Sequence, residues 1–296
     1  MNRRAFLRSI GAAAASVRGV RLQADLQTSW RTFEIATRVH VQQPAGVTRV
    51  WLPTPLAAAP YQKTLGDTYH ADGGSLTMVE REDVDMLVAV WPDGADPILT
   101  LISQVQTTMY AANLETPTVP PPKDFASFNR DLRGTRLLPL DGASKDRAAA
   151  MTRGAGTDFD KARAIFDAIA DTPAGQLDAR DPNVVFVGLA RAAGLPARAV
   201  FGLRVANADA TKAQHCRAEV YLVGYGWVPI DARDRLFGSW AMQWIGYNSA
   251  HDVALPGSSR GAVGSLMYPQ GETANGRLDS LNPDAFRYQI AVREIR

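Results

Sequence analysis

Cysteine is almost absent from this chain of 296 residues, because only Cys216 is present. A single thiol excludes an intrachain disulfide, and it excludes a structural zinc site built from several thiolates. The sequence also lacks any run of about 18 apolar residues, the length that a membrane-spanning helix requires. We therefore predict no disulfide scaffold and no membrane span.

A strong charge of either sign is absent as well, since the formal net charge is +2. Residues 1–24 hold five arginines and no acidic residue, so the rest of the chain carries a net charge of −3. Proteins that bind nucleic acids usually present a concentrated basic face, and no such partner is expected here. With 46% hydrophobic and 21% charged residues, the composition is that of a globular protein with a sizeable core.

The N-terminus has the pattern of an export signal. Arg3 and Arg4 form a basic pair, and an apolar run of small residues follows over 10–17. This order is typical of a twin-arginine (Tat) signal, and a short amphipathic helix or a flexible basic end is the alternative. We predict a signal segment over 1–24 and a periplasmic mature protein.

The first half of the remaining chain has strand-like patterns separated by turn signals such as Asp72-Gly-Gly74. Short strands at this spacing predict an antiparallel, sandwich-like domain over 25–112, and a β extension without its own core is the alternative. The expected strands are 33–41, 47–52, 75–79, 86–91 and 98–107. This half contains no residue pattern that predicts chemistry.

A proline-rich stretch over 113–123 cannot form a regular helix or strand, so 113–140 is interpreted as a linker. Helices are expected next, over 141–152 and from Thr157, where the sequence shows a capping pattern. A third helix is expected over 183–193; it is apolar almost all round and should be buried. Strands return from 198 onward, so the whole chain is predicted to be an α+β protein with a second domain over 141–296.

The residues with chemical potential are concentrated in a predicted hairpin of strands 215–222 and 227–231. Successive side chains of a strand alternate between faces, so Cys216 should point into a core. His215 should point to the opposite surface, on one face with Arg217, Glu219 and Tyr221. This geometry argues against a Cys216–His215 catalytic pair. The hairpin should bring Asp231 close to His215, where a carboxylate can fix the tautomer of an imidazole. The alternative is a surface histidine and a strand-ending aspartate that are merely neighbours.

Four segments together resemble the transglutaminase-like superfamily, which has the papain-like cysteine-hydrolase fold. They are Phe186-Val-Gly-Leu-Ala-Arg-Ala-Ala-Gly-Leu-Pro-Ala-Arg198, Gly202, His215-Cys-Arg-Ala-Glu-Val-Tyr221 and Gly226-Trp-Val-Pro-Ile-Asp231. Over most of its length the chain is similar to bacterial exported proteins with such a domain. The resemblance implies a buried helix packed on an antiparallel sheet. It also implies that His215 is the catalytic base and that Asp231 is the acid that orients it.

The nucleophile of that family does not match. The resemblance implies a cysteine at the N-terminus of the buried helix, where the helix dipole and a nearby imidazolium lower a thiol pKa. Alignment through Asp181 and Asn183 places Ala179 at that position. Alanine carries no nucleophile, so thioester chemistry cannot start there.

The leading hypothesis is therefore an exported domain that has kept a groove and binds a peptide or protein without turning it over. The alternative is an active cysteine protease or transglutaminase with a different nucleophile, for which Thr172 and Cys216 are the only nearby candidates in sequence. A nonfunctional gene product is a third possibility. The oligomeric state is left open.

No cofactor and no metal is predicted. His215, Asp231, His251 and Asp252 could be imagined as ligands, but no metal-binding spacing supports such a site. Trp227, Trp240 and Trp244 could line a groove for a peptide or glycan, and core packing is the favoured alternative.

Overall fold

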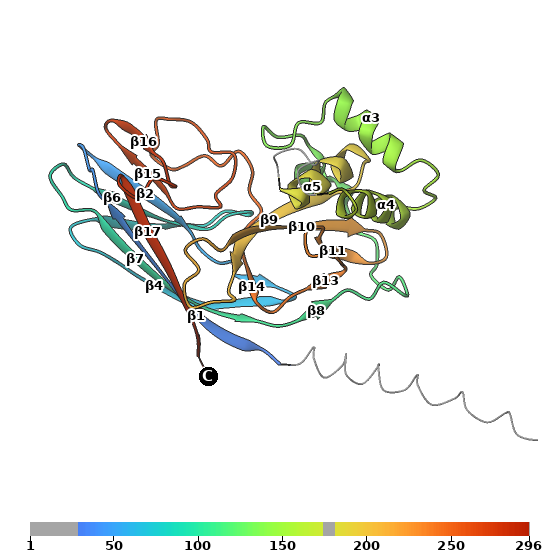
Figure 1. The fold of residues 1–296 in the computed structure, drawn as a ribbon, viewed down its shortest axis with the longest axis horizontal. Coiled ribbons are helices and arrows are strands. Elements are labelled where there is room, and N and C mark those ends of the chain that lie inside the picture. The colour runs from blue at the N-terminus through green and yellow to red at the C-terminus, as the bar shows by residue number, and fades with distance from the viewer. Residues whose placement is uncertain (1–28, 174–180, 296) are drawn as a thin grey trace, which may run out of the picture.

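The computed structural model describes residues 29–173 and 181–295, and the predicted signal segment lies outside them. Two lobes are visible in Figure 1, a β-sandwich and a lobe in which helices lie on one face of another sheet. The architecture is α+β, as predicted, with antiparallel pairing throughout the sheets. None of the described helices is long and apolar enough to cross a membrane.

The sandwich consists of two five-stranded sheets with strand orders β17-β1-β7-β4-β3 and β16-β15-β2-β6-β5. Their bounds are β1 Arg31–Val41, β2 Thr48–Pro53, β3 Ala58–Ala59, β4 Gln62–Ala71, β5 Ser75–Val79, β6 Met86–Trp91, β7 Ile98–Thr107, β15 Gln270–Thr273, β16 Gly276–Leu278 and β17 Phe286–Ile295. Side chains alternate along β1 and β7 between a buried and a more exposed face. Val39, Leu99 and Trp91 are fully buried between the sheets, so the sandwich has a core of its own.

The last part of the chain corrects the predicted domain boundaries. Residues 141–296 were expected to form one domain, but β17 pairs along the whole of β1 and β15 pairs with β2. The C-terminal strands thus complete the first lobe. The reason is that an amphipathic strand pattern specifies a half-buried strand and not its partner, which only the folded chain selects.

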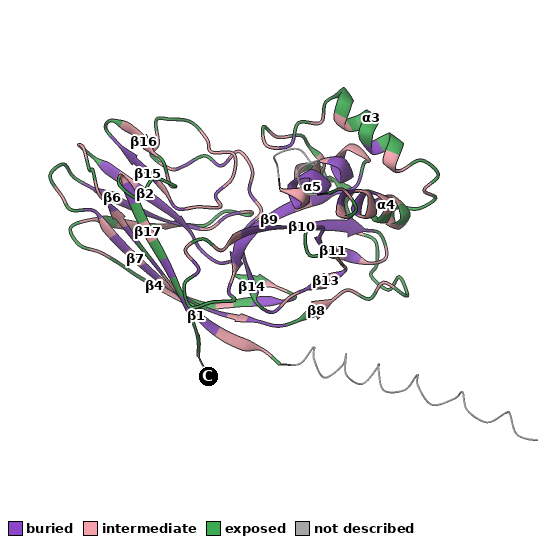
Figure 2. Ribbon diagram, viewed as in Figure 1, coloured by how far each residue is buried: buried purple, intermediate pink, exposed green. Residues whose placement is uncertain are grey.

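Short helices interrupt the predicted linker, where η1 covers Phe125–Phe128 and α2 covers Asn129–Leu132. Three longer helices follow: α3 Gly142–Met151, α4 Asp158–Ala170 and α5 Pro182–Ala192. Thr157 and Asp160 form the predicted capping box of α4, each side chain bonding to the other's backbone N–H. Figure 2 shows α5 largely buried and α3 largely exposed, which agrees with the apolar pattern of α5.

The second lobe is built on a five-stranded sheet with the order β12-β11-β10-β9-β14. Its strands are β9 Ala197–Arg204, β10 Gln214–Leu222, β11 Gly226–Asp231, β12 Leu236–Phe237 and β14 Trp244–Asn248, while β13 Ser239–Trp240 pairs with β8 Tyr110–Ala111. Helix α5 packs on β9 and β10, and Phe186, Ala218 and Val228 are among the buried residues between them.

Both faces of β10 are buried, which corrects the expectation that His215, Arg217, Glu219 and Tyr221 face the surface. Arg217 is 1% exposed and Glu219 is 3% exposed. Tyr61 from the first lobe covers this face, and its hydroxyl donates to Glu219 at 2.9 Å. Strand alternation was predicted correctly, but a polar face can be covered when its groups find partners inside the protein.

Candidate functional site

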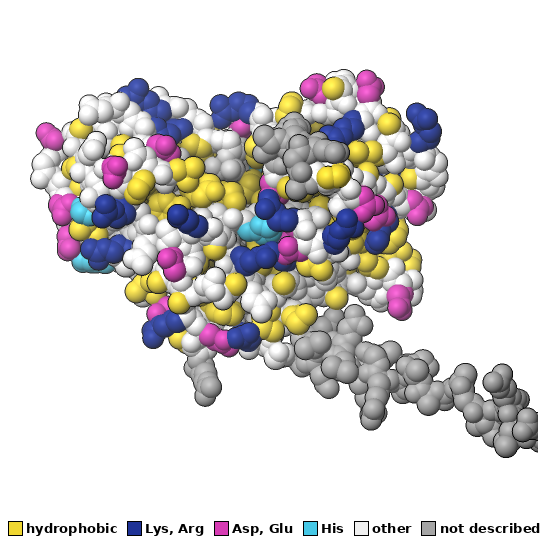
Figure 3. Space-filling model, in the orientation of Figure 1, with side chains coloured by type: hydrophobic (Ala, Val, Ile, Leu, Met, Phe, Trp, Pro, Cys, Tyr) yellow, Lys and Arg dark blue, Asp and Glu magenta, His cyan; other side chains and the backbone are white. Residues whose placement is uncertain are grey.

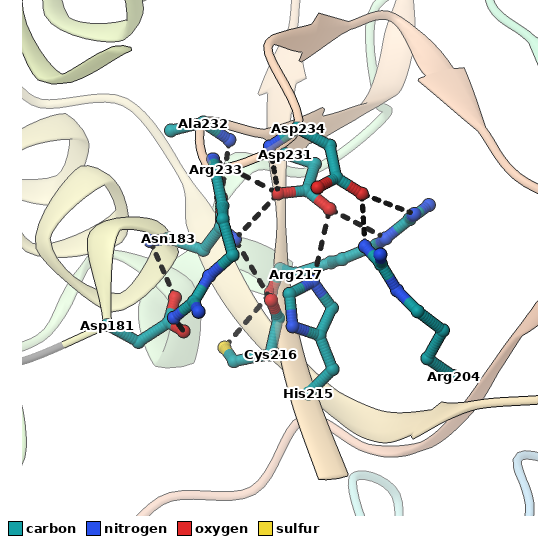
Figure 4. A network of polar contacts seen from close by, with 10 residues as sticks. All are labelled: Asp181, Asn183, Arg204, His215, Cys216, Arg217, Asp231, Ala232, Arg233 and Asp234. Carbon is teal, nitrogen blue, oxygen red and sulfur yellow. Dashed lines mark hydrogen bonds and ion pairs between the residues drawn. The ribbon is translucent and has the colours of Figure 1, made fainter. Parts of the chain in front are cut away.

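The β10–β11 hairpin brings His215 and Asp231 into contact. The antiparallel register pairs Ala218 with Ile230, and its continuation places Asp231 opposite Arg217 with His215 on the diagonal. The Nε2 atom of His215 lies 3.2 Å from Oδ2 of Asp231. The predicted proximity of the two side chains is therefore present in the structure (Figure 4), whereas their catalytic role stays a prediction.

Asp231 is fully buried, and donors contact both of its oxygens. Oδ1 accepts hydrogen bonds from Nδ2 of Asn183 and from the backbone N–H groups of Arg233 and Asp234. Oδ2 faces His215 and Nε of Arg217, the latter at 3.0 Å. Burial by itself would raise the pKa of Asp231, but these donors and positive charges outweigh it and lower the pKa to about 2. The carboxylate is thus held ionised.

Asn183 is a site residue that the sequence analysis used only for alignment. It lies in the first turn of α5, where its side chain is completely buried. Nδ2 donates to the backbone oxygen of Cys216 at 2.9 Å and to Asp231, and Oδ1 accepts the N–H of Ala232 at 2.7 Å. One amide therefore joins α5, β10 and the end of β11. A polar residue in the first turn of an otherwise apolar, buried helix was the signal that could have revealed it.

Arg217 is a second residue of the site that sequence reasoning missed. Its guanidinium lies 5.2 Å and 5.4 Å from the ring centres of Trp240 and Trp244 and shares Oδ2 of Asp231 with His215. Its position two residues after His215 on the same strand face was the available signal. A buried cation at this place helps to keep Asp231 in its charged form.

The two ring nitrogens of His215 have different surroundings. Nε2 faces Asp231, while Nδ1 is turned away from that carboxylate (Figure 4) and has no hydrogen-bond partner among residues 29–173 and 181–295. The side chain keeps 10% of its exposure. An imidazole fixed through one nitrogen by a carboxylate has the other nitrogen available to take or deliver a proton.

Cys216 does not take part in this arrangement. Its side chain belongs to the core cluster beneath α5, and its thiol donates only to the neighbouring backbone oxygen of Arg217, at 3.4 Å. Burial, together with the negative charges of Asp181 and Asp231, raises the pKa of the thiol well above its ordinary value. A buried, protonated thiol is a poor nucleophile.

Thr172 has its hydroxyl occupied too, because Oγ1 donates to the backbone oxygen of Ala168 one turn earlier, at 2.7 Å. Ala179, the residue at the expected nucleophile position, lies outside the described residues. The described chain resumes at Asp181, which caps α5 by accepting the N–H of Asn183 at 2.9 Å. This terminus is the place where the resemblance expects a nucleophile.

The tryptophans that were considered for a groove divide into two kinds. Trp240 and Trp244 are buried, with their rings 4.2 Å apart, and Tyr61 stacks on Trp240 at 3.9 Å. Trp227 is half-buried under Arg198, which lies 4.0 Å from its ring centre. Packing therefore accounts for Trp240 and Trp244.

The four residues once considered as metal ligands do not form one group. His251 contacts Oγ1 of Thr135 and Asp252 pairs with Arg136, whereas His215 and Asp231 pair with each other. Across residues 29–173 and 181–295, no three His, Cys, Asp or Glu side chains are gathered as metal ligands would be.

Comparison with known sequences finds a family match over the part of the chain that holds His215 and Asp231. Residues 174–232 match the family model of the transglutaminase-like superfamily, a segment that contains α5 and the β10–β11 hairpin. An uncharacterized protein of Haemophilus influenzae is 33% identical in an alignment of 158 residues, and the match covers 39% of this chain. The matched part is 43% of that curated relative, so the chain spans less than half of its length.

Comparison with solved structures finds chains of similar fold. A proposed cysteine protease from Cytophaga hutchinsonii aligns with a TM-score of 0.56 at 15% identity, covering 90% of this chain and 99% of the other. At this identity the likeness establishes the fold alone. The periplasmic domain of TgpA from Pseudomonas aeruginosa aligns over 72% of this chain and 91% of the other, at 14% identity, and its TM-score of 0.36 is too low to carry an argument.

Proposed function

Because the chain carries a transglutaminase-like domain, we propose that it binds a peptide or protein at the His215–Asp231 site without cleaving or cross-linking it. The observation that carries this proposal is the contrast within the site. Asp231 accepts several hydrogen bonds and faces His215, whereas the single thiol of the chain is buried on the other face of β10. The family position for a nucleophile is occupied by Ala179.

The surroundings of His215 suit a peptide. Gly202 lies opposite His215 in the β9–β10 register and also lines a narrow apolar cavity of only about 10 Å³ with Leu52, Tyr247 and Met267. In the middle of the face drawn in Figure 3, one histidine lies among several basic side chains, next to a hollow rich in hydrophobic side chains. Apolar contacts near a few polar groups are the usual composition of a binding site.

We further propose that the protein acts outside the cytoplasm. The paired arginines and small apolar run of residues 1–24 support export by the Tat route. Signal-sequence fusion to a reporter that is active only after Tat export tests this, with Arg3→Lys and Arg4→Lys together as the control. Export of the double variant at the unchanged rate would contradict the proposal.

The function is tested by restoring the missing nucleophile. The full chain and its Ala179→Cys variant are assayed for hydrolysis of quenched fluorescent peptides and for incorporation of a fluorescent amine into dimethylated casein. We expect no turnover by the unchanged protein and measurable turnover by Ala179→Cys, because the resemblance expects the nucleophile at this position and a thiol at a helix N-terminus beside an imidazole is activated. The Ala179→Cys, His215→Ala double variant is the matched control and should be inactive.

Turnover by the unchanged protein at a rate that His215→Ala abolishes would overturn the proposal, since a nucleophile would then exist. If Ala179→Cys shows no turnover but the same peptides bind, the protein has a binding site that has lost both the nucleophile and the catalytic geometry. If Ala179→Cys shows no turnover and no peptide binds, the proposed function is wrong.

A further inference from the structure

A cavity of about 540 Å³ opens beside the His215–Asp231 site, between the end of β9 and the ends of β1 and β17. Its walls come from both lobes: Phe33 and Val292 belong to the sandwich, and Trp244 belongs to the second sheet. The volume lies in the range of small-ligand sites, large enough for a peptide side chain together with adjoining backbone. None of the chemistry described above uses it.

The cavity is directly connected to the carboxylate of the site. Arg217 lines it and contacts Oδ2 of Asp231, and Asp234 lines it and donates its backbone N–H to Oδ1 of the same residue. Figure 4 shows Arg204, Arg217 and Asp234 converging on one side of Asp231. A group that binds Arg217 or Asp234 in the cavity would therefore be linked to His215 through Asp231.

Three cations and two anions line the cavity, and a third anion nearby, Asp231, is shared between Arg217 and His215. Arg31, Arg204 and Arg217 face it from three different strands, against the carboxylates of Asp234 and Glu294. Arg31 pairs with Glu294 and Arg204 pairs with Asp234. The third guanidinium, that of Arg217, reaches Asp234 only at 3.9 Å and must share Asp231 with His215.

Hydrogen-bond donors are in excess. Arg217 is 1% exposed, and its buried Nη1 has no acceptor among the described residues. Buried Nε1 of Trp244, another lining residue, has none either. Buried donors without acceptors are costly and uncommon in native proteins, and a ligand that brings acceptor oxygens relieves such an imbalance. Burial also lowers the pKa of Arg217, against the opposing effects of Asp231 and Asp234, which agrees with an incompletely compensated cation.

From this cavity, its three guanidinium groups and its unmatched donors, we infer that the site recognises ligands carrying a carboxylate, which docks between Arg204 and Arg217 beside the His215–Asp231 pair. The inference rests on the proposed function, because it names the class of peptide that the site takes. Guanidinium groups suit a carboxylate because they offer paired donors in the plane of the anion. The carboxylate could be an acidic side chain or the C-terminus of a peptide.

Isothermal titration of the full chain with three tetrapeptides of otherwise equal sequence tests this. One contains glutamine and is blocked at both ends, one contains glutamate and is blocked at both ends, and one contains glutamine with a free C-terminus. We expect at least one of the two carboxylate peptides to bind about tenfold or more tightly than the neutral one. Which of them does so distinguishes the side-chain source from the C-terminal source.

The position of the carboxylate site is tested by substituting two arginines. Arg204→Gln should abolish the preference for the carboxylate peptide, and the variant should fold because the Arg204 side chain is 42% exposed. Arg293→Gln is the matched control: Arg293 is also ion-paired, to Glu34, and sits on β17 between the lining residues Val292 and Glu294 without lining the cavity. Its preference should be unchanged.

Ala241→Phe, which fills the cavity from its wall, should likewise remove the preference. Equal binding of all three peptides, or a preference that survives in both Arg204→Gln and Ala241→Phe, would overturn the carboxylate site while leaving the proposed function intact. Absence of binding by every peptide would overturn both. The two failures are therefore distinguishable.

Discussion

Asn183 donates a hydrogen bond from Nδ2 to Oδ1 of Asp231 at 3.1 Å and thereby ties the first turn of α5 to the end of β11. The same amide accepts the N–H of Ala232 and donates to the backbone of Cys216. The helix start at which the family expects a nucleophile and the carboxylate that faces His215 are thus held together by one buried side chain. We regard Asn183 as a positioning residue of the site.

Replacing this amide should destabilise the protein. Asn183→Ala leaves the buried N–H of Ala232 and the oxygen of Cys216 without partners, and we expect a loss of about 2–4 kcal/mol in the free energy of unfolding. Urea denaturation followed by circular dichroism measures it. Gln104→Ala, at an exposed position of β7, is the control and should change stability by less than about 0.5 kcal/mol. Equal stabilities of the two variants would contradict the assigned role.

Acid should weaken the fold through Asp231. Its pKa is about 2 in the folded protein, against an ordinary value of 3.8, so its ionisation stabilises the native state above pH 4. This contribution, about 2 kcal/mol, is lost as the pH falls from about 4 to about 2. The stability difference between the unchanged protein and Asp231→Asn, measured by urea denaturation, should shrink over that window. A difference independent of pH would show that the carboxylate is not held ionised.

Protonation of His251 should weaken the fold at a higher pH than protonation of Asp231 does. Burial and the charge of Arg191 lower its pKa from 6.5 to about 4, with Asp252 opposing. A histidine kept neutral in the folded state stabilises the protein above pH 6.5, and the contribution is lost as the pH falls from 6.5 to about 4. Titration of the histidine ring signals by NMR should show His251 protonating near pH 4. An ordinary pKa for His251 would contradict the environment described for it.

Cys216 should be unreactive in the native protein. Its thiol is buried and its pKa is raised, so iodoacetamide at pH 8 should leave the folded chain unlabelled and add one carboxamidomethyl group in urea. Mass spectrometry measures both states. The Ala179→Cys variant should gain one label while still folded. Full labelling of the folded, unchanged chain would revive Cys216 as a candidate nucleophile.

Gly202 should resist substitution because of a close approach between strands. A Cβ at this position would lie 2.0 Å from the backbone oxygen of Ile245 on β14. Gly202→Ala should therefore separate β9 from β14 and cost about 2 kcal/mol or more in thermal or urea unfolding. Gly66→Ala is the control, since nothing lies within 4 Å of its Cβ position. Similar stabilities would show that β14 can move away without cost.

Local structure could be predicted from the sequence where short-range rules decide it. The limits of β5, β6 and β7 agree with the expected ranges, because alternation and turn residues act over a few positions. β4 was missed: its exposed and half-buried residues carry no clear apolar alternation. Its position is decided by pairing with β7, which lies far along the chain.

The candidate site shows the same division. The nearness of His215 and Asp231 follows from a hairpin, which is a local element, and could be predicted from the sequence. The hydrogen bonds to Asp231 could not be predicted in the same way, because Asn183 donates one of them from a helix more than forty residues earlier in the chain. Arg217 was placed on the correct strand face, but that face was expected to be exposed, since nothing in the strand shows that Tyr61 and Trp240 cover it.

The sequence by itself determined most of the local secondary structure and the hairpin that joins His215 to Asp231, and it has an alanine where the resemblance expects a nucleophile. These depend on residue types and on spacings of a few residues. Only the tertiary structure decided that the last strands close the sandwich, that both faces of β10 are buried, and that a basic cavity lies beside the site. Each of these depends on contacts between segments far apart in the chain, whose partners are selected when the hydrophobic surfaces of the whole chain are buried together.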